Sequence, residues 1–176
     1  MFVQVAPAES SGETPIRRSN LIRDELVSFP FANEPEVNTI VHCLERSAKT
    51  WPSNNLLGRR PVKDGKAGDF EWQSYDAVWK DVVNVGVGMR DMCKLESGTS
   101  GEGQARIGIY SMNRPENFKV LLGGFSQRIC ACPLYDTLGA NAVGYIIGHA
   151  EVTCVATERA KLASLIASKK GASPLR

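Results

Sequence analysis

The sequence has few of the residues from which enzymes assemble catalytic groups. It contains only two histidines, and neither stands in a recognisable catalytic context with a serine, cysteine or carboxylate. No G-x-x-x-x-G-K-[ST] phosphate loop occurs, and no helical pattern carries the His and Glu spacing of a metal site. The residues by themselves therefore predict no mechanism and no catalytic, cofactor-binding or metal-binding residue.

The chain also lacks an excess of charge of either sign. Its 21 Lys and Arg residues nearly balance its 19 Asp and Glu residues, which leaves a net charge of +2. Basic residues form isolated pairs, at Arg17-Arg18, Arg59-Arg60 and Lys169-Lys170, and no basic block or stripe. We therefore expect no nucleic-acid partner, because phosphate backbones are bound by clustered positive charge.

Long apolar runs are missing as well. No run approaches the ~20 residues that span a bilayer, so no transmembrane segment is expected. The first residues, MFVQVAPAESSGETPIRRS, lack the basic region and apolar core of a signal peptide. Peripheral association with a membrane stays open.

Five cysteines, an odd number, are scattered among apolar residues. Cys130-Ala131-Cys132 raises the question of a metal site, but alternate residues of a strand share one face, so a common buried face explains the spacing equally well. No second Cys/His pair stands at ligand spacing. The pattern favours reduced thiols in an intracellular compartment.

Periodic apolar residues organise the stretch from Ala105 to Ala156. Short β-rich runs at Arg106–Ser111, Ile129–Leu134 and Val152–Ala156 alternate with two segments of helical spacing. The helical positions are Phe118, Leu121, Leu122 and Phe125, then Val143, Ile146, Ile147 and Ala150. This order predicts an α/β fold with a parallel-sheet βαβαβ unit over about residues 105–170.

The residues before this unit divide into an arm and a body. Residues 1–33 lack clear periodicity and predict an extended N-terminal arm, followed by an incomplete α/β subdomain over 34–176. A first helix is expected after Asn38 or Thr39 as N-cap, ending at Pro52. Asn55–Arg59 and Phe70–Gln73 then predict a short hairpin that turns at residues 63–68, and Ser74 caps a second helix.

Several smaller features have structural interpretations. Gly86-Val87-Gly88 imitates part of a dinucleotide fingerprint, but its place inside a helix favours close helix packing. The segment 96–103, ESGTSGEG, is predicted to be a surface loop, since no lysine follows it to bind phosphate.

Three further positions mark the ends of elements or a candidate site. Asn113 and Glu116 predict a near capping box with Pro115 in the first helical turn, and Thr157 predicts the cap of a last helix. In that last helix Leu162, Leu165 and Ile166 are expected to face inward. Asp136 follows a strand end, where open α/β sheets bind ligands, and it is the single carboxylate in a suggestive place, although turns also favour Asp there.

Several stretches follow one another in the order of a known family. They are PIRRS (Pro15–Ser19), VNTI (Val37–Ile40), NLLGRRP (Asn55–Pro61), FEWQSY (Phe70–Tyr75), RIGIYSMNRP (Arg106–Pro115), PLYDTLG (Pro133–Gly139) and AVGYIIGHAEV (Ala142–Val152). Through them the chain resembles the N-terminal segment of eukaryotic long-chain fatty-acid–CoA ligases, in the adenylate-forming, AMP-binding superfamily. Asn117 and Cys132 depart from the residues usual in that family.

The resemblance implies a reaction for the full-length family. Such enzymes use ATP and magnesium to activate a fatty acid as an acyl-adenylate, then transfer the acyl group to coenzyme A. The family's ATP phosphate loop, adenine-binding motifs and C-terminal domain have no counterpart in this sequence, so no catalytic residue is carried over. We expect the chain alone to bind no cofactor, to be inactive and to aggregate through an exposed sheet face. The resemblance implies a place in the cytoplasm or at the membrane of the endoplasmic reticulum or peroxisome.

Two interpretations of the chain remain open. It is either part of such a ligase, truncated in sequence, or a non-catalytic α/β interaction module derived from one. The end at Ser173-Pro174-Leu175-Arg176, directly after a predicted surface helix, favours truncation, because natural short proteins more often cover a sheet edge.

Overall fold

The computed structural model describes residues 2–20, 31, 33–95, 104–135, 137, 139 and 141–168. The chain forms two compact units, Met1–His42 and Cys43–Arg176. The first contains an antiparallel hairpin of β1 (Phe2–Ala6) and β2 (Ile16–Ser19), with an irregularity between Gln4 and Ala6. Regular strand pairing here was not predicted. The valines of β1 and Ile16 are β-formers whose weak alternation is too short to stand out in the sequence.

Helix α1 (Ile40–Thr50) begins at the predicted cap. The Thr39 hydroxyl oxygen accepts a hydrogen bond from the His42 backbone N–H at 3.1 Å, which satisfies one of the free amides of the first turn. The helix ends before Pro52 as predicted. Leu44 and Ala48 of this helix are buried, whereas Trp51, just beyond its end, is 47% exposed.

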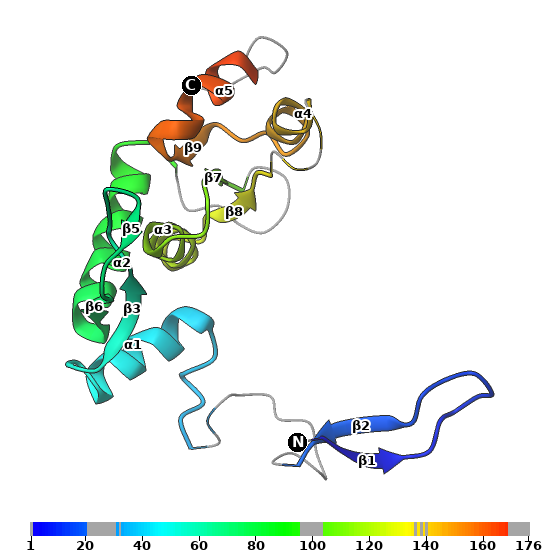
Figure 1. Ribbon diagram of the computed structural model, residues 1–176. Helices are drawn as coiled ribbons and strands as arrows, with labels where there is room; N and C mark the ends of the chain where they lie inside the picture. Colours follow the sequence, from blue (N-terminus) through cyan, green and yellow to red (C-terminus); the bar gives the residue numbers. More distant parts are fainter. Residues whose placement is uncertain are drawn as a thin grey trace. The chain divides into compact units, whose positions relative to one another are not determined.

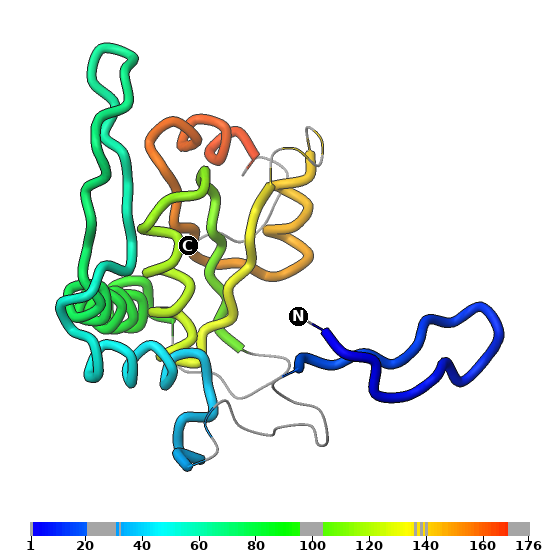
Figure 2. Tube along the Cα trace, turned by 60° about the horizontal axis from the view of Figure 1, so that its bottom comes forward, coloured from blue at the N-terminus to red at the C-terminus, as the bar shows by residue number. Residues whose placement is uncertain are grey.

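The predicted hairpin is confirmed. Strands β3 (Asn55–Arg59) and β6 (Glu71–Ser74) pair antiparallel, and beyond them the short strands β4 (Val62–Lys63) and β5 (Lys66–Ala67) close the tip. Asp64 and Gly65 turn the chain with φ values of 50° and 73°, the left-handed pair that a two-residue hairpin turn requires. Figure 2 shows this hairpin as a long double strand that extends beyond the helices beside it.

Helix α2 (Tyr75–Asp91) packs along α3 (Pro115–Ser126). The Ser74 side chain caps α2 by accepting from the Ala77 N–H, as predicted. The close packing expected of the glycine pair holds for Gly86, where a Cβ would lie 2.7 Å from the Gly123 carbonyl oxygen. It is wrong for Gly88, which has open space at that position.

The predicted βαβαβ unit is confirmed. Strands β7 (Arg106–Tyr110), β8 (Cys130–Pro133) and β9 (Cys154–Thr157) form a parallel sheet in the order β8-β7-β9. Helix α3 connects β7 to β8, and α4 (Ala142–His149) connects β8 to β9 (Figure 1). A 3-10 turn, η2 (Arg159–Lys161), and α5 (Leu162–Ser168) follow β9.

Helices cover both faces of this sheet. On one face Tyr110 and Leu134 pack with residues of α4 and α5, including Val143, Ile147 and Leu165. On the opposite face Ile107 of β7 packs with Met89 at the end of α2, and Val120 of α3 contacts the same cluster. The chain from β7 therefore turns to one face and the chain from β9 to the other.

Several local predictions are wrong. Arg114, which makes no side-chain cap bond, precedes α3, and Asn113 does not cap it. The Thr157 hydroxyl donates to the Tyr110 carbonyl oxygen at 2.9 Å inside the sheet instead of capping a helix. Of the three residues expected to face inward in the last helix, Leu165 is buried, whereas Leu162 and Ile166 are 45% and 60% exposed.

The cysteine prediction is only half right. Cys132 is half-buried, and burial raises the pKa of its thiol, but Cys130 is exposed and does not share a buried face with it. The predicted loop 96–103 and the Lys169-Lys170 pair lie outside the described residues.

Candidate binding cleft at the carboxyl ends of β7 and β9

The sheet topology itself creates a crevice. Neighbouring strands β7 and β9 end at the same edge, and the chain leaves them toward opposite faces, which is where open α/β sheets bind ligands. A cleft of 630 Å³ lies there, with an adjoining one of 460 Å³. The larger cleft is lined by residues 112–116, Phe118 and Glu158, and on its other side by Leu57, Gly58, Arg59 and Arg60.

Arg114 joins the two strand ends electrostatically. Its Nε donates to Glu116 Oε2 at 2.8 Å, and its Nη1 lies 3.5 Å from Glu158 Oε2. The hydrogen bond to Glu116 raises the pKa of Arg114, and the same bond from Arg114 lowers the pKa of Glu116. Glu158 is the more enclosed carboxylate, with 15% of its side chain exposed against 52% for Glu116. Both carboxylates thus pair with one guanidinium.

A second set of hydrogen bonds fixes the loop after β7. The Met112 backbone N–H donates to Glu158 Oε1 at 3.0 Å, which ties this loop to the residue that follows β9. The Ser111 hydroxyl donates to the side-chain oxygen of Asn117. The side-chain nitrogen of Asn117 in turn donates to the Met112 carbonyl oxygen at 2.9 Å. The floor of the cleft is therefore preorganised by bonds among its own polar groups.

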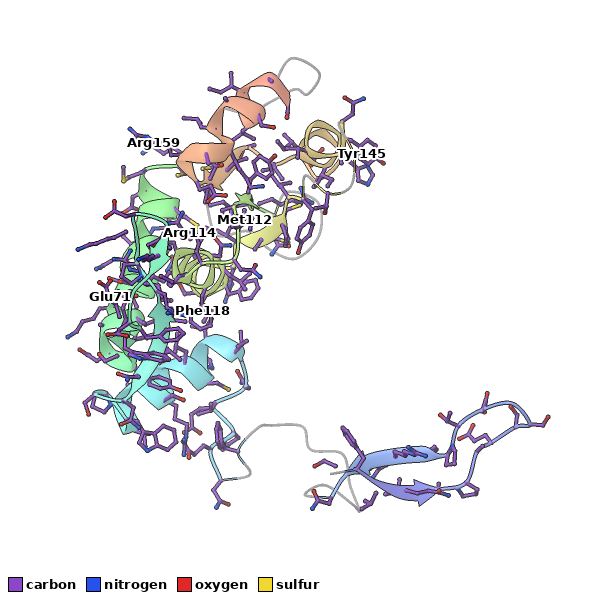
Figure 3. The ribbon with its side chains drawn as sticks, viewed as in Figure 1. Glu71, Met112, Arg114, Phe118, Tyr145 and Arg159 are labelled. Atoms are coloured by element: carbon purple, nitrogen blue, oxygen red, sulfur yellow. The ribbon has the colours of Figure 1, made fainter. Side chains whose placement is uncertain are left out.

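The hairpin supplies the opposite wall. Arg59 pairs with Glu71 at 3.1 Å, and Arg60 donates to the Gly68 carbonyl oxygen at 2.7 Å. A second hollow of 330 Å³ between Trp72 and Lys119 adjoins this wall. Figure 3 shows Met112, Arg114 and Phe118 near one another beside β3, whereas Tyr145 lies on α4 away from the cleft.

The sequence indicated a different strand end. Asp136, the candidate after β8, lies outside the described residues. The sequence predicted no binding role for residues after β7 or β9, so Arg114 and Glu158 were missed as members of the cleft. The signal for them was the run SMNRPEN directly after a buried strand, together with a charged residue after the last strand, but their pairing depends on the β8-β7-β9 order.

Among the described residues that line the cleft, no side chain is free to act as a general base. Its carboxylates are both paired with Arg114, and the Ser111 hydroxyl donates to an amide, which cannot remove its proton. The histidines lie elsewhere, His42 on α1 and His149 on α4 stacked against Tyr145. Among the residues that the structure describes, no three His, Cys, Asp or Glu side chains come together as metal ligands.

Comparison with known proteins decides the family. The profile of AMP-binding enzymes matches residues 44–175, three quarters of the chain. This protein belongs to the AMP-binding enzyme family. The resemblance to long-chain acyl-CoA synthetases is confirmed by curated relatives of that name in Arabidopsis thaliana. Long chain acyl-CoA synthetase 4 is 39% identical over 119 residues, and synthetase 2 is 30% identical over 168 residues. A peroxisomal acyl-CoA ligase of Penicillium roqueforti is 32% identical over 169 residues.

The match covers most of this AMP-binding chain but a small part of each relative. The alignments take in 68%, 96% and 95% of this chain and 17%, 24% and 23% of the three relatives, respectively. The chain therefore spans about a sixth to a quarter of the length of the curated relatives that it matches, and it is a partial AMP-binding domain.

Solved structures confirm the α/β fold. The A domain of a carboxylic acid reductase from Segniliparus rugosus superposes with a TM-score of 0.64 at 11% identity, over 77% of this chain and 23% of that one. A fatty acyl CoA synthetase from Mycobacterium tuberculosis gives 0.58 at 17% identity, over 77% and 24%. The predicted parallel sheet with its helices is thus the architecture of adenylate-forming N-terminal domains.

The charged side chains that line this cleft of the AMP-binding chain do not fit a triphosphate. The three arginines of the cleft already have partners. Arg59 pairs with Glu71, Arg60 donates to two backbone carbonyl oxygens, and Arg114 pairs with two carboxylates. A triphosphate placed there would face the carboxylates of Glu116 and Glu158, and none of these three arginines would be free to bind it.

None of the helices in the described parts of the chain is long and apolar enough to cross a bilayer.

Proposed function

We propose that this chain forms the first sheet-bearing part of a long-chain fatty-acid–CoA ligase, which converts a fatty acid, ATP and coenzyme A into acyl-CoA, AMP and diphosphate. The observation that carries the proposal is the family match over residues 44–175, with curated relatives that are long-chain acyl-CoA synthetases at 30–39% identity. ATP, magnesium and coenzyme A are bound by parts of the enzyme beyond these residues. The role of this chain is to hold the sheet and the cleft edge in place.

The polar bonds of the cleft support a positioning role. Glu158 bonds to the Met112 N–H and pairs with Arg114, so it connects the chain after β9 to the chain after β7. In an open α/β sheet these loops form the border of the ligand crevice. A fixed border gives later segments of the ligase a rigid surface on which to place reacting groups.

A chimera tests the proposal. The segment of Arabidopsis long chain acyl-CoA synthetase 4 that matches this chain is replaced by the matching 119 residues of this chain. We expect ATP-dependent formation of palmitoyl-CoA at more than about a tenth of the parental rate. This rate corresponds to an activation free energy raised by less than ~1.4 kcal/mol. The control is the same chimera with Gly123→Leu, whose side chain would collide with the Val82 carbonyl oxygen. A folded chimera without activity would contradict the proposal.

The alternative, a non-catalytic interaction module, predicts another outcome. The chimera would be inactive, and the chain alone would form a stable complex with an intact ligase in gel filtration. Both results together would favour the module over the ligase part. Formation of palmitoyl-CoA by the chimera would exclude the non-catalytic module.

For the compartment we propose peripheral association with an organelle membrane, that of the endoplasmic reticulum or the peroxisome. The hairpin supports this, because Val62 and Phe70 are 66% and 57% exposed and Lys63 faces Lys66 across the tip. Exposed aromatic and apolar groups beside cations are typical of membrane-interface elements. Two curated relatives, both from Penicillium, are named as peroxisomal.

Vesicle sedimentation tests the membrane proposal. The paired change Val62→Ser with Phe70→Ser should weaken binding of the chain to phosphatidylcholine–phosphatidylserine vesicles at least about tenfold, since two apolar side chains leave the interface. The matched control changes Val83→Ser with Val87→Ser, two valines exposed on α2. Equal binding of both variants would contradict a role of the hairpin.

A further inference from the structure

The turn at the tip of the hairpin places two lysines directly opposite each other. Lys63 of β4 pairs with Lys66 of β5, so the two side chains leave the same face of this short ladder. Both residues are exposed. Among the residues that the structure describes, no carboxylate forms an ion pair with either ammonium group. The tip therefore carries two adjacent cations that remain available to a partner.

This arrangement of like charges is unfavourable for the chain by itself. Charges of one sign at directly opposed positions of two strands destabilise a hairpin. The carboxylates nearest in sequence are those of Asp64 and Asp69, and neither forms an ion pair with these lysines in the described part of the chain. An external anion beside both ammonium groups would offset the repulsion.

Exposed apolar side chains accompany the two lysines. Val62 precedes Lys63 in β4 and is exposed, as is Phe70 on the returning strand. The Phe70 ring stacks on that of Trp72 in β6, with the ring centroids 5.3 Å apart, and Trp72 is itself exposed. A partner that matches the tip therefore combines negative charge with an apolar part.

The two aromatic rings are held in place by the hairpin itself. The Arg60 guanidinium lies 5.8 Å from the centroid of the Phe70 ring and donates to two backbone carbonyl oxygens across the hairpin. A Cβ on Gly58 would come within 2.8 Å of the Trp72 ring, so the indole lies directly against β3 at this glycine. Rings that are ordered before binding lower the entropic cost of an interaction.

We propose that the hairpin tip binds the head groups of anionic phospholipids, with Lys63 and Lys66 beside the negative charge and Phe70 at the apolar boundary. This inference rests on the membrane association proposed above, and it adds the lipid class and the residues that select it. A bilayer surface offers anionic groups directly above an apolar layer, which matches both parts of the tip. The hairpin extends beyond the helices beside it (Figure 2), so a flat surface can reach its tip.

Sedimentation of the full chain with vesicles tests the lipid class. Vesicles of phosphatidylcholine alone are compared with vesicles that also contain phosphatidylserine, and we expect the latter to bind at least about tenfold more tightly. Lys63→Gln with Lys66→Gln should weaken binding to the phosphatidylserine vesicles at least about tenfold. The physical reason is that each lysine beside an anionic surface contributes about fivefold to affinity.

Two paired variants serve as controls. Lys49→Gln with Lys80→Gln removes the same charge from two exposed lysines on α1 and α2, and it should leave binding within about twofold of the unchanged chain, because those lysines lie away from the tip. Lys63→Arg with Lys66→Arg keeps the charge of the tip and should retain binding.

The outcomes separate the lipid class from membrane association as such. Equal binding of the unchanged chain to both kinds of vesicle would overturn the anionic lipid and leave membrane association standing. Equal binding of the tip variant and the α1–α2 control would have the same meaning. If the chain binds neither kind of vesicle, both proposals fail. Displacement from phosphatidylserine vesicles by soluble polyglutamate of equal total charge would overturn the lipid and favour an acidic protein as partner.

Discussion

Gly86 and Gly123 lie so close that a Cβ on Gly123 would come within 3.0 Å of the Gly86 backbone nitrogen and 2.9 Å of the Val82 carbonyl oxygen. The two glycines let the backbones of α2 and α3 approach directly. The same crossing places Lys119 of α3 against Asp81 of α2 at 2.6 Å. Helix α3 in turn begins at the cleft, so this approach sets the position of the cleft border.

Substitution of these glycines should therefore be costly. Gly123→Ala is expected to destabilise the chain by about 1–3 kcal/mol, because the obstructing atoms belong to the backbone and cannot rotate away. Urea denaturation followed by circular dichroism measures the change. Gly88→Ala is the matched control, since nothing lies within 4 Å of its Cβ position, and it should stabilise α2 by ~0.5–1 kcal/mol. Equal effects at the two positions would contradict the close crossing.

The core of the sheet face under α4 yields a second prediction. Ile147 is fully buried among Tyr110, Leu134 and Val152, so Ile147→Ala should cost about 2–5 kcal/mol through lost burial and a cavity. Ile166→Ala, at a residue that is 60% exposed, should change stability by less than ~0.5 kcal/mol. The midpoints of urea unfolding compare the two. A large loss of stability in Ile166→Ala would contradict the exposed position of this side chain on α5.

The Arg114–Glu116 pair predicts a pH effect. The hydrogen bond from Arg114 lowers the pKa of Glu116 in the folded chain. The pair therefore stabilises the fold fully above the ordinary carboxyl pKa, and this contribution is lost as the pH falls through the lowered value. In Arg114→Gln the Glu116 pKa should rise toward its ordinary range, because the largest cause of its lowering is removed. An NMR titration of the side-chain carboxyl carbon measures this rise.

Arg90→Gln is the control for that titration. Arg90 forms a similar exposed pair with Asp91, whose pKa it lowers through a hydrogen bond. Its loss should raise the pKa of Asp91 and leave Glu116 unchanged. A Glu116 pKa that stays low in Arg114→Gln would mean that another group holds the carboxylate ionised.

The activity of the chain alone is the fourth prediction. With ATP, magnesium, palmitate and coenzyme A, residues 1–176 should form no palmitoyl-CoA above the blank, because their cleft cations are already paired with carboxylates and carbonyls. Mass spectrometry of the thioester product is the measurement. Product formation by the purified chain would contradict the proposed division of labour within the ligase.

Much of the fold could be predicted from local patterns. The spacing and length of apolar runs predict the strands around Ile107 and Val155 and the helix around Leu122. The helix caps Thr39 and Ser74 depend only on hydrogen bonds to backbone groups a few residues away. The hairpin followed from two β-rich runs and an Asp-Gly turn. These features depend on short-range interactions that the sequence displays directly.

The cleft could not be predicted in the same way. Glu158 belongs to it because β9 lies beside β7 and not beside β8, and neither strand pattern encodes that order. Thr157 likewise has the residue type of a helix cap, but its hydroxyl meets the Tyr110 carbonyl oxygen across the ladder. The exposed Cys130 shows the same limit, because alternation predicts a shared face but not which elements cover it.

The left-handed turn at Asp64 and Gly65 also has a consequence for the order of folding. Its geometry sets the register of the hairpin within a few residues, so the two strands can pair locally in about 1–10 μs. The pairing of Ile107 with Cys154, in contrast, must close a long loop that contains two helices and β8. The hairpin is therefore expected to be present while the sheet is still assembling, as a ready surface for α2 and α3.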